Sequence, residues 1–67
     1  MTIGERIRMI RKEKKLTQKQ LGELCNIAEP TIRRYELGGL NPKIQTIEKI
    51  AKALGVPTSC FIELYEP

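Results

Sequence analysis

The sequence predicts an all-α domain made of five short helices. Apolar residues recur at spacings of three and four, the period of a helix with one buried face. Capping motifs, glycines and prolines divide the chain into short segments with short connections. No alternation of apolar and polar residues indicates a strand. The expected helices cover residues 3–14, 18–25, 29–37, 43–54 and 57–64, within one domain of residues 1–67.

The first two helices are predicted to begin at capping boxes. A threonine is followed three residues later by a side chain that can reach back, in Thr2 with Glu5 and in Thr17 with Gln20. In such a pair, each side chain satisfies a backbone N–H that the helix leaves without a partner. The inward positions expected in these helices are Ile3, Ile7, Ile10, Leu21 and Leu24.

The second and third helices are separated by a sharp turn. Gly22 lies inside a helix, where glycine costs about 1 kcal/mol relative to alanine. This predicts that another backbone approaches closely at that point. Asn26 follows where the chain turns, and asparagine tolerates the left-handed conformation. Pro30 suits the first turn of the third helix.

The fourth helix has the clearest amphipathic pattern of the chain. Asn41 and Pro42 are interpreted as its cap and its first-turn proline, and Gly55 ends it. Its apolar stripe is Ile44, Ile47, Ile50, Ala51 and Leu54. Phe61 is the expected core residue of the fifth helix, and Ile32 and Tyr35 are those of the third.

Composition excludes several classes of site. The chain has two cysteines and no histidine, which leaves no ligand set for zinc and too few cysteines for a disulfide framework. We expect no cofactor and two reduced cysteines. No segment has the length of a membrane helix or the pattern of a signal peptide, which predicts a soluble, cytoplasmic protein. With no histidine, no aspartate and Ser59 as its one serine, the chain is not expected to be an enzyme.

The charge pattern indicates a polyanionic partner. The chain has 12 basic and 8 acidic residues, for a net charge of +4. Most basic residues fall in the first twenty positions or at Arg33 and Arg34, whereas the last segment is acidic. One basic end of this kind is typical of a surface that meets nucleic acid, although a solvated lysine face gives the same pattern.

An ordered set of residues resembles the lambda-repressor/Cro (XRE-like) helix-turn-helix family over residues of about 3 to 64. Two short helices with a small residue early in the first and an αL-tolerant residue at the turn have the spacing of that motif. The residues that carry the resemblance include Leu16-Thr17-Gln18, Leu21-Gly22, Thr31-Ile32, Tyr35-Glu36, Asn41-Pro42 and Ile50-Ala51-Lys52-Ala53-Leu54-Gly55-Val56.

The resemblance implies a five-helix bundle whose second helix rests on the DNA backbone and whose third enters the major groove. It implies that Gln18 bonds a phosphate and that Arg11 and Glu36 form a structural ion pair between the first and third helices. The sequence departs from the family pattern at Ala28, where a capping serine or threonine is usual. It also departs at Leu37 and in the loop of residues 39–41, where polar or basic phosphate-binding residues are usual.

The outward side of the third helix is expected to read bases. Arg33 or Arg34 would bond guanine, or else contact phosphate or solvent. Glu29 would accept a hydrogen bond from cytosine, or would pair with Arg33 four residues later. Pro30 would touch a thymine methyl group, or would only shape the helix start. The expected phosphate-binding residues are Gln18, Lys19, Thr31, Asn41 and Lys43, although Thr31 has a local bond at the helix terminus as its alternative.

The predicted function is sequence-specific binding of double-stranded DNA by a transcriptional regulator, with a repressor favoured. Leu64 and Tyr65 are expected at the contact of a homodimer on an inverted repeat, with incidental packing or a frayed end as the alternative. The competing hypothesis is a protein-interaction module, such as an antitoxin or a repressor partner, built on the same fold. Leu37 and Leu40 favour that hypothesis, and Arg33 and Arg34 oppose it. No small-molecule effector is indicated.

Overall fold

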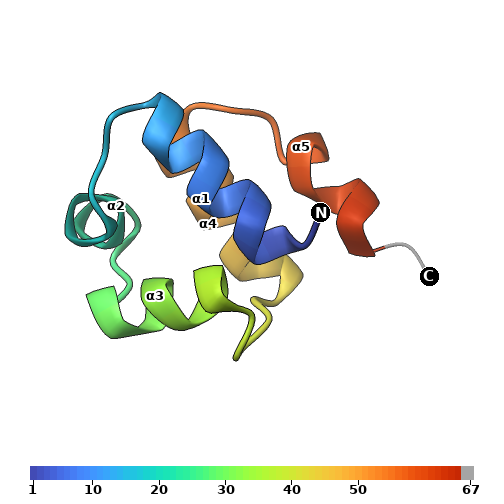
Figure 1. Ribbon diagram of the computed structural model, residues 1–67. Helices are drawn as coiled ribbons and strands as arrows, with labels where there is room; N and C mark the ends of the chain where they lie inside the picture. Colours follow the sequence, from blue (N-terminus) through green and yellow to red (C-terminus); the bar gives the residue numbers. More distant parts are fainter. Residues whose placement is uncertain (66–67) are drawn as a thin grey trace.

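The computed structural model describes residues 1–65, and every regular element within that range is helical (Figure 1). The elements follow the predicted order, and the short connections agree with the sequence punctuation. They are α1 (Ile3–Glu13), α2 (Gln18–Cys25), α3 (Glu29–Leu37), α4 (Ile44–Leu54), α5 (Ser59–Ile62) and the 3₁₀ helix η1 (Glu63–Tyr65). Within this range, no helix is long and apolar enough to cross a membrane.

Both predicted capping boxes are formed. The Glu5 N–H donates to Thr2 Oγ1 at 3.1 Å, and the Thr2 N–H donates to Glu5 Oε1 at 2.8 Å. Thr17 and Gln20 make the same reciprocal pair at 3.0 Å and 2.8 Å. The bond from the backbone N–H of Thr2 lowers the pKa of the Glu5 carboxyl, because it stabilises the carboxylate. The starts of α1 and α2 are therefore fixed by local chemistry.

Helix ends differ from the prediction in three helices, α1, α4 and α5. The first helix ends at Glu13 instead of Lys14, and Lys15 adopts a left-handed φ of 60° that turns the chain away. The fourth helix begins at Ile44, so the interpretation of Asn41 and Pro42 as its cap and first-turn proline is wrong. Lys43 is the N-cap, without a side-chain capping bond, and Pro42 is buried ahead of it.

The predicted fifth helix of residues 57–64 is shorter than expected. Only Ser59–Ile62 is α-helical, and the chain then tightens into η1. Thr58 precedes this helix without a side-chain capping bond. The segment is fastened through Phe61, which is fully buried, and through Arg6 of α1, whose Nη1 donates to the Cys60 carbonyl oxygen at 2.7 Å.

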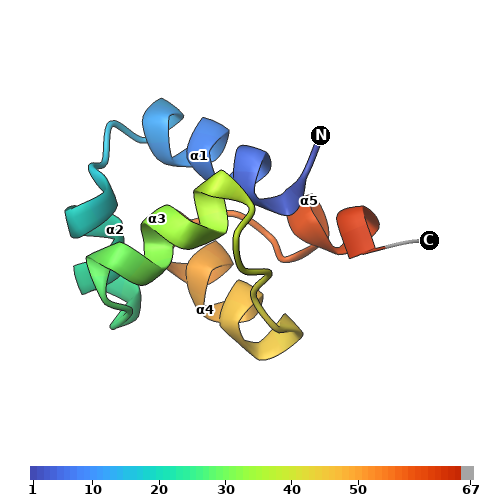
Figure 2. The same cartoon turned by 60° about the horizontal axis from the view of Figure 1, so that its bottom comes forward.

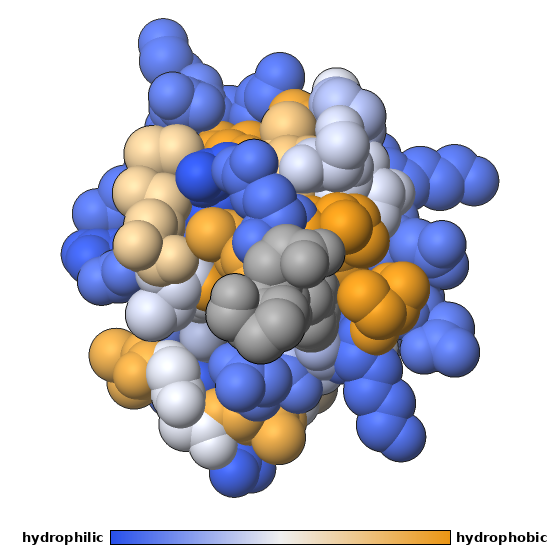
Figure 3. Space-filling view, turned by 90° about the vertical axis from the view of Figure 1, so that its right-hand side faces the viewer, coloured by the Kyte–Doolittle hydropathy of each residue, from blue (hydrophilic) through white to orange (hydrophobic). Residues whose placement is uncertain are grey.

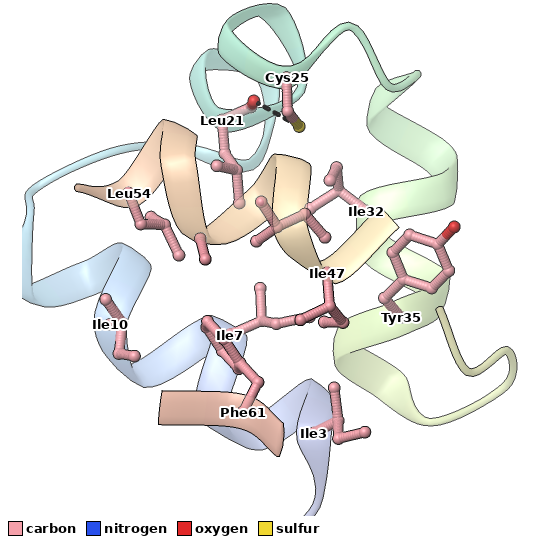
Figure 4. Close-up of a cluster of buried hydrophobic side chains, with 12 residues drawn as sticks. Ile3, Ile7, Ile10, Leu21, Cys25, Ile32, Tyr35, Ile47, Leu54 and Phe61 are labelled. Carbon is pink, nitrogen blue, oxygen red and sulfur yellow. Dashed lines mark hydrogen bonds between the residues drawn. The ribbon is translucent and has the colours of Figure 1, made fainter. Parts of the chain in front are cut away.

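The core lies where α1, α2, α3, α4 and α5 converge (Figure 4). The largest fully buried side chains come from all five helices: Ile7, Leu21, Ile32, Ile47, Ile50 and Phe61. The prediction that Leu24 faces inward is wrong. Leu24 is 60% exposed, and its neighbour Cys25 occupies the buried position. Ile44, at the start of the α4 stripe, is also exposed.

Gly4 sets the distance between α1 and α3. A Cβ atom at this position would collide with the Tyr35 carbonyl oxygen, and it would lie 3.1 Å from the Glu36 carbonyl carbon. Only glycine allows the first turn of α1 to rest on the backbone of the last turn of α3. Figure 2 shows the result, with α3 crossing in front of α1 and α4 and its N-terminal end beside α2.

Candidate nucleic-acid interface

The turn between α2 and α3 is closed by two backbone features. Asn26 has φ 59° and ψ 43°, the left-handed conformation predicted for it, and the Ile27 N–H donates to the Gly22 carbonyl oxygen at 2.8 Å. A Cβ atom at Gly22 would overlap the Ile27 carbonyl oxygen. The predicted close approach is therefore made by the turn itself, which folds back over α2 and fixes the angle at which α3 leaves.

A buried ion pair joins α3 to α1. Arg11 Nε donates to Glu36 Oε2 at 2.7 Å, and Arg11 Nη2 donates to Glu36 Oε1 at 3.0 Å. The side chains are 9% and 3% exposed. Arg11 Nη1 also donates to the Leu16 carbonyl oxygen at 2.8 Å. The bidentate geometry satisfies both carboxylate oxygens, which is the condition under which a buried charge is tolerated.

Gln18 belongs to the same network. Its Nε2 donates to Glu36 Oε1 at 3.1 Å, so the side chain at the first position of α2 is held against α3. An amide nitrogen has two hydrogens, and this bond uses one of them. The half-buried Gln18 thus keeps a donor for a further acceptor at the N-terminus of α2. Lys19 beside it is exposed.

The outward side of α3 carries the side chains expected to read bases. Pro30, Arg33 and Arg34 are exposed, and Glu29 and Thr31 are half-buried. The Arg33 guanidinium lies 3.7 Å from the Glu29 carboxylate, with side chains 53% and 42% exposed. Ala28, the N-cap of α3, makes no side-chain capping bond. The structure therefore has the Glu29–Arg33 pair that was one of the two predicted alternatives.

The remaining predicted residues lie apart from α3. Lys43 is exposed at the start of α4. Asn41 is exposed and lines a hollow with Met1, Ile3 and Leu64, so it sits near the beginning of α1. Leu64 is half-buried and packs against the core. The side chain of Tyr65, the other predicted dimer contact, lies outside the described residues.

Two features of this region were not anticipated from the sequence. The approach of Gly4 to Tyr35 positions α3 from behind, and no local pattern around Gly4 signals it. The bond from Gln18 to Glu36 couples the expected phosphate contact to the buried pair. The family resemblance implies a role for each of Arg11, Gln18 and Glu36. The spacing of these residues in the sequence does not indicate that all three side chains meet.

A protein-family model described as helix-turn-helix matches residues 7–59, which is most of the chain and includes both α2 and α3. The chain belongs to the helix-turn-helix family. Its all-helical architecture is that of the lambda-repressor type, as the resemblance implied. Among the residues described, no group of three potential ligands is arranged to hold a metal ion.

Two similar proteins are repressors, and one of them matches in two solved structures. The immunity repressor protein of Bacillus phage phi105 is 44% identical over 62 residues, which cover 92% of this chain and 43% of that protein. The solution structure of the P22 c2 repressor DNA-binding domain matches with a TM-score of 0.84 and 29% identity, covering 88% of this chain and 78% of that domain. The crystal structure of the P22 c2 repressor with a synthetic operator matches with a TM-score of 0.82 and 27% identity. The match covers 91% of this chain and 94% of that chain. The chain spans between 37% and 49% of three further curated relatives.

Proposed function

We propose that this helix-turn-helix chain binds a specific sequence of double-stranded DNA and represses transcription, with α3 in the major groove. The carrying observation is the outward side of α3, where Arg33 and Arg34 are exposed on a helix whose other side is locked into the core. The likeness to a repressor structure that contains an operator supports this orientation. The similar proteins from phi105 and P22 are named as repressors and not as enzymes. The proposed compartment is the cytoplasm.

In the proposed complex, Arg33 and Arg34 read bases from the major groove. A guanidinium can donate two parallel hydrogen bonds to O6 and N7 of guanine. The 3.7 Å pair with Glu29 does not prevent this, because an ion pair between exposed side chains contributes only about 0–1 kcal/mol. Glu29 is then free to accept from a cytosine amino group. Pro30 offers only an apolar contact, of the kind that suits a thymine methyl group.

The proposed phosphate contacts come from α2, from α3 and from the segment just before α4. Gln18 and Lys19 lie at the N-terminus of α2, where backbone N–H groups also face outward. Gln18 reaches the phosphate with the amide hydrogen that Glu36 leaves free. Thr31, Asn41 and Lys43 are the further candidates, and Thr31 is the least exposed of the three.

We infer that the repressor acts as a homodimer on an inverted repeat. The side of the molecule that carries α5 exposes apolar side chains between charged ones (Figure 3). Ile62 and Met1 are exposed there, and Leu64 is half-buried. Pairing of two copies through this surface, with Leu64 and Tyr65 at the contact, predicts half-sites about 34–36 Å apart, one turn of the duplex.

The test is selection from a pool of randomised duplex DNA at moderate salt. The expected result is enrichment of one palindromic motif, with half-sites about ten base pairs apart. Analytical ultracentrifugation with the selected duplex measures the number of chains bound. Enrichment of a single half-site would retain DNA recognition and reject the homodimer. Binding without any enriched sequence would reject the proposed function.

A further inference from the structure

A hollow of about 430 Å³ lies between α2 and α4, outside the proposed DNA interface. The two helices pack side by side (Figure 4). The hollow lies along their C-terminal halves, which supply its lining residues. Its lining consists of Leu24, Cys25, Asn26, Lys49, Lys52 and Ala53. None of these residues is acidic.

The floor of this hollow is apolar. Leu24 is 60% exposed, although it follows three residues after the fully buried Leu21. Ala53 is half-buried beside it, and the Cys25 thiol below donates to the Leu21 carbonyl oxygen at 3.1 Å. A single exposed leucine is ordinary on a protein surface. Here Leu24 forms part of a concave surface. An apolar side chain that enters the hollow would therefore contact Leu24 and other lining residues at the same time.

The rim of the hollow is basic. Lys49 and Lys52 are three residues apart on α4, so their side chains project from the same side of the helix. Both are exposed, and neither makes an ion pair with any carboxylate in the described part of the chain. Burial raises the pKa of the Cys25 thiol, and the positive charge of Lys49 partly opposes that shift.

The hollow faces away from the part of α2 that is proposed to meet DNA. Six residues separate Leu24 from Gln18, and on an α-helix this spacing rotates a side chain by about 120°. Lys19 is about 140° away by the same reasoning. Leu24 therefore faces away from the two residues of α2 that would contact phosphates.

We propose that this hollow binds an acidic amphipathic segment of a partner protein. An apolar side chain of the segment packs on Leu24 and Ala53, and flanking carboxylates pair with Lys49 and Lys52. Recognition of an amphipathic helix in a groove combines these two terms. Duplex DNA fits less well, because phosphates pair with lysine but leave the leucine floor uncovered. This inference does not depend on the proposed operator binding.

The test is an NMR titration of the ¹⁵N-labelled chain with a synthetic helix-forming peptide of about fourteen residues. The probe carries leucines four positions apart with glutamates beside them, and the matched probe has glutamine at every glutamate. Shift changes are expected at Leu24, Cys25, Lys49, Lys52 and Ala53, and not at Arg33 or Arg34. The glutamine probe is expected to bind roughly tenfold more weakly.

Two variants locate the site. The pair Lys49→Glu and Lys52→Glu is expected to weaken binding of the acidic peptide by roughly tenfold or more. The pair Arg8→Glu and Lys12→Glu makes the same change in net charge at another hollow, where Met9 is accompanied by the acidic Glu5, and is expected to have little effect. Leu24→Ala is expected to weaken binding by roughly fivefold. All of these side chains are exposed, and thermal melting verifies folding.

Four results would overturn the proposal. The first is an absence of chemical-shift changes at millimolar peptide. The second is a set of shift changes centred on Arg33 and Arg34, because the peptide would then bind as a polyanion at the DNA interface. Equal loss of peptide binding in both charge-reversal pairs would also overturn the proposal, because net charge alone would then explain the interaction. Loss of affinity for duplex DNA of any sequence in the Lys49 and Lys52 pair, beyond that of its control, would reassign these lysines to phosphate.

Discussion

The two sides of α3 carry ion pairs of opposite character. On the inward side, Glu36 meets Arg11 through two hydrogen bonds, and both side chains are almost fully buried. On the outward side, Glu29 and Arg33 lie 3.7 Å apart and are about half exposed. The same helix thus has a buried carboxylate, Glu36, and an exposed carboxylate, Glu29, for which water can take the place of the arginine partner.

This difference separates the residues that hold α3 from those that are available to a ligand. Removing one partner of a buried pair leaves an uncompensated charge, whereas breaking an exposed pair lets water take over. Inward changes should therefore alter folding, and outward changes should alter binding. Five variants test this separation, from the largest expected effect to the smallest.

Glu36→Ala is expected to lower the free energy of unfolding by about 3–5 kcal/mol, because it leaves the Arg11 guanidinium buried without its carboxylate. Urea denaturation followed by circular dichroism measures this loss. The double variant Arg11→Met and Glu36→Leu removes both charges and should recover most of the stability. A single variant as stable as the original chain would contradict the structural role of the pair.

Gly4→Ala is expected to lower the free energy of unfolding by about 1–3 kcal/mol, because the new methyl group would force α1 away from the Tyr35 carbonyl oxygen. Gly39→Ala is the matched control, since a Cβ atom there would lie 3.9 Å from the nearest atom. Thermal unfolding of the two variants compares them directly. Equal melting temperatures would show that the contact between α1 and α3 can relax.

Arg33→Ala is expected to cost about 1–3 kcal/mol of discrimination at one base pair, with stability changed by no more than about 0.5 kcal/mol. The measurement is the affinity for the selected duplex and for its single-site substitutions. Arg8→Ala removes an exposed arginine from α1 and serves as the control. A uniform loss across all duplexes would instead assign Arg33 to phosphate.

Lys19→Ala is expected to weaken binding by a similar factor for every DNA sequence. The loss of one phosphate contact should reduce the slope of log affinity against log salt by about 0.9. A salt titration of duplex binding checks this, with Lys12→Ala of α1 as the comparison. A slope equal to that of the original chain would remove Lys19 from the proposed interface.

Glu29→Gln is expected to have the smallest effect, with the free energy of unfolding changed by less than about 0.5 kcal/mol. It should strengthen non-specific DNA binding slightly, because a negative charge next to the phosphates is removed. If Glu29 accepts from cytosine, the same variant also loses preference at one base pair of the selected motif. A stability loss above about 1 kcal/mol would mean that the exposed pair is structural after all.

Local chemistry made most helix boundaries predictable, but tertiary packing decided the positions that were missed. The capping boxes at Thr2 and Thr17 predicted the starts of α1 and α2. The asparagine at position 26 predicted the turn, where it adopts the left-handed conformation. Leu24 and Cys25 lie three and four residues after Leu21, so both suit an inward position. The placement of α4 buries Cys25 and leaves Leu24 open, and periodicity within α2 does not contain that information.

The same distinction holds at the candidate interface. The composition and spacing of α3 nominated its outward residues, which the structure leaves accessible. The predicted start of α4 is wrong, because Asn41 and Pro42 have the residue types of a cap and a first-turn proline, whereas Pro42 is buried and the backbone is still extended at Lys43. The bond between Gln18 and Glu36 spans α2 and α3, so it depends on how the turn orients the two helices.

The contacts of Arg6 indicate that the order of the helices along the chain can be changed by circular permutation. Its bond to the Cys60 carbonyl oxygen and its 3.5 Å approach to Glu63 hold α5 beside the start of α1, and Met1 and Leu64 line one hollow. A short linker can therefore join these two ends in a circular permutant opened at Gly39, an exposed loop position. Such a chain would keep α2 and α3 contiguous while giving α4 a new free end.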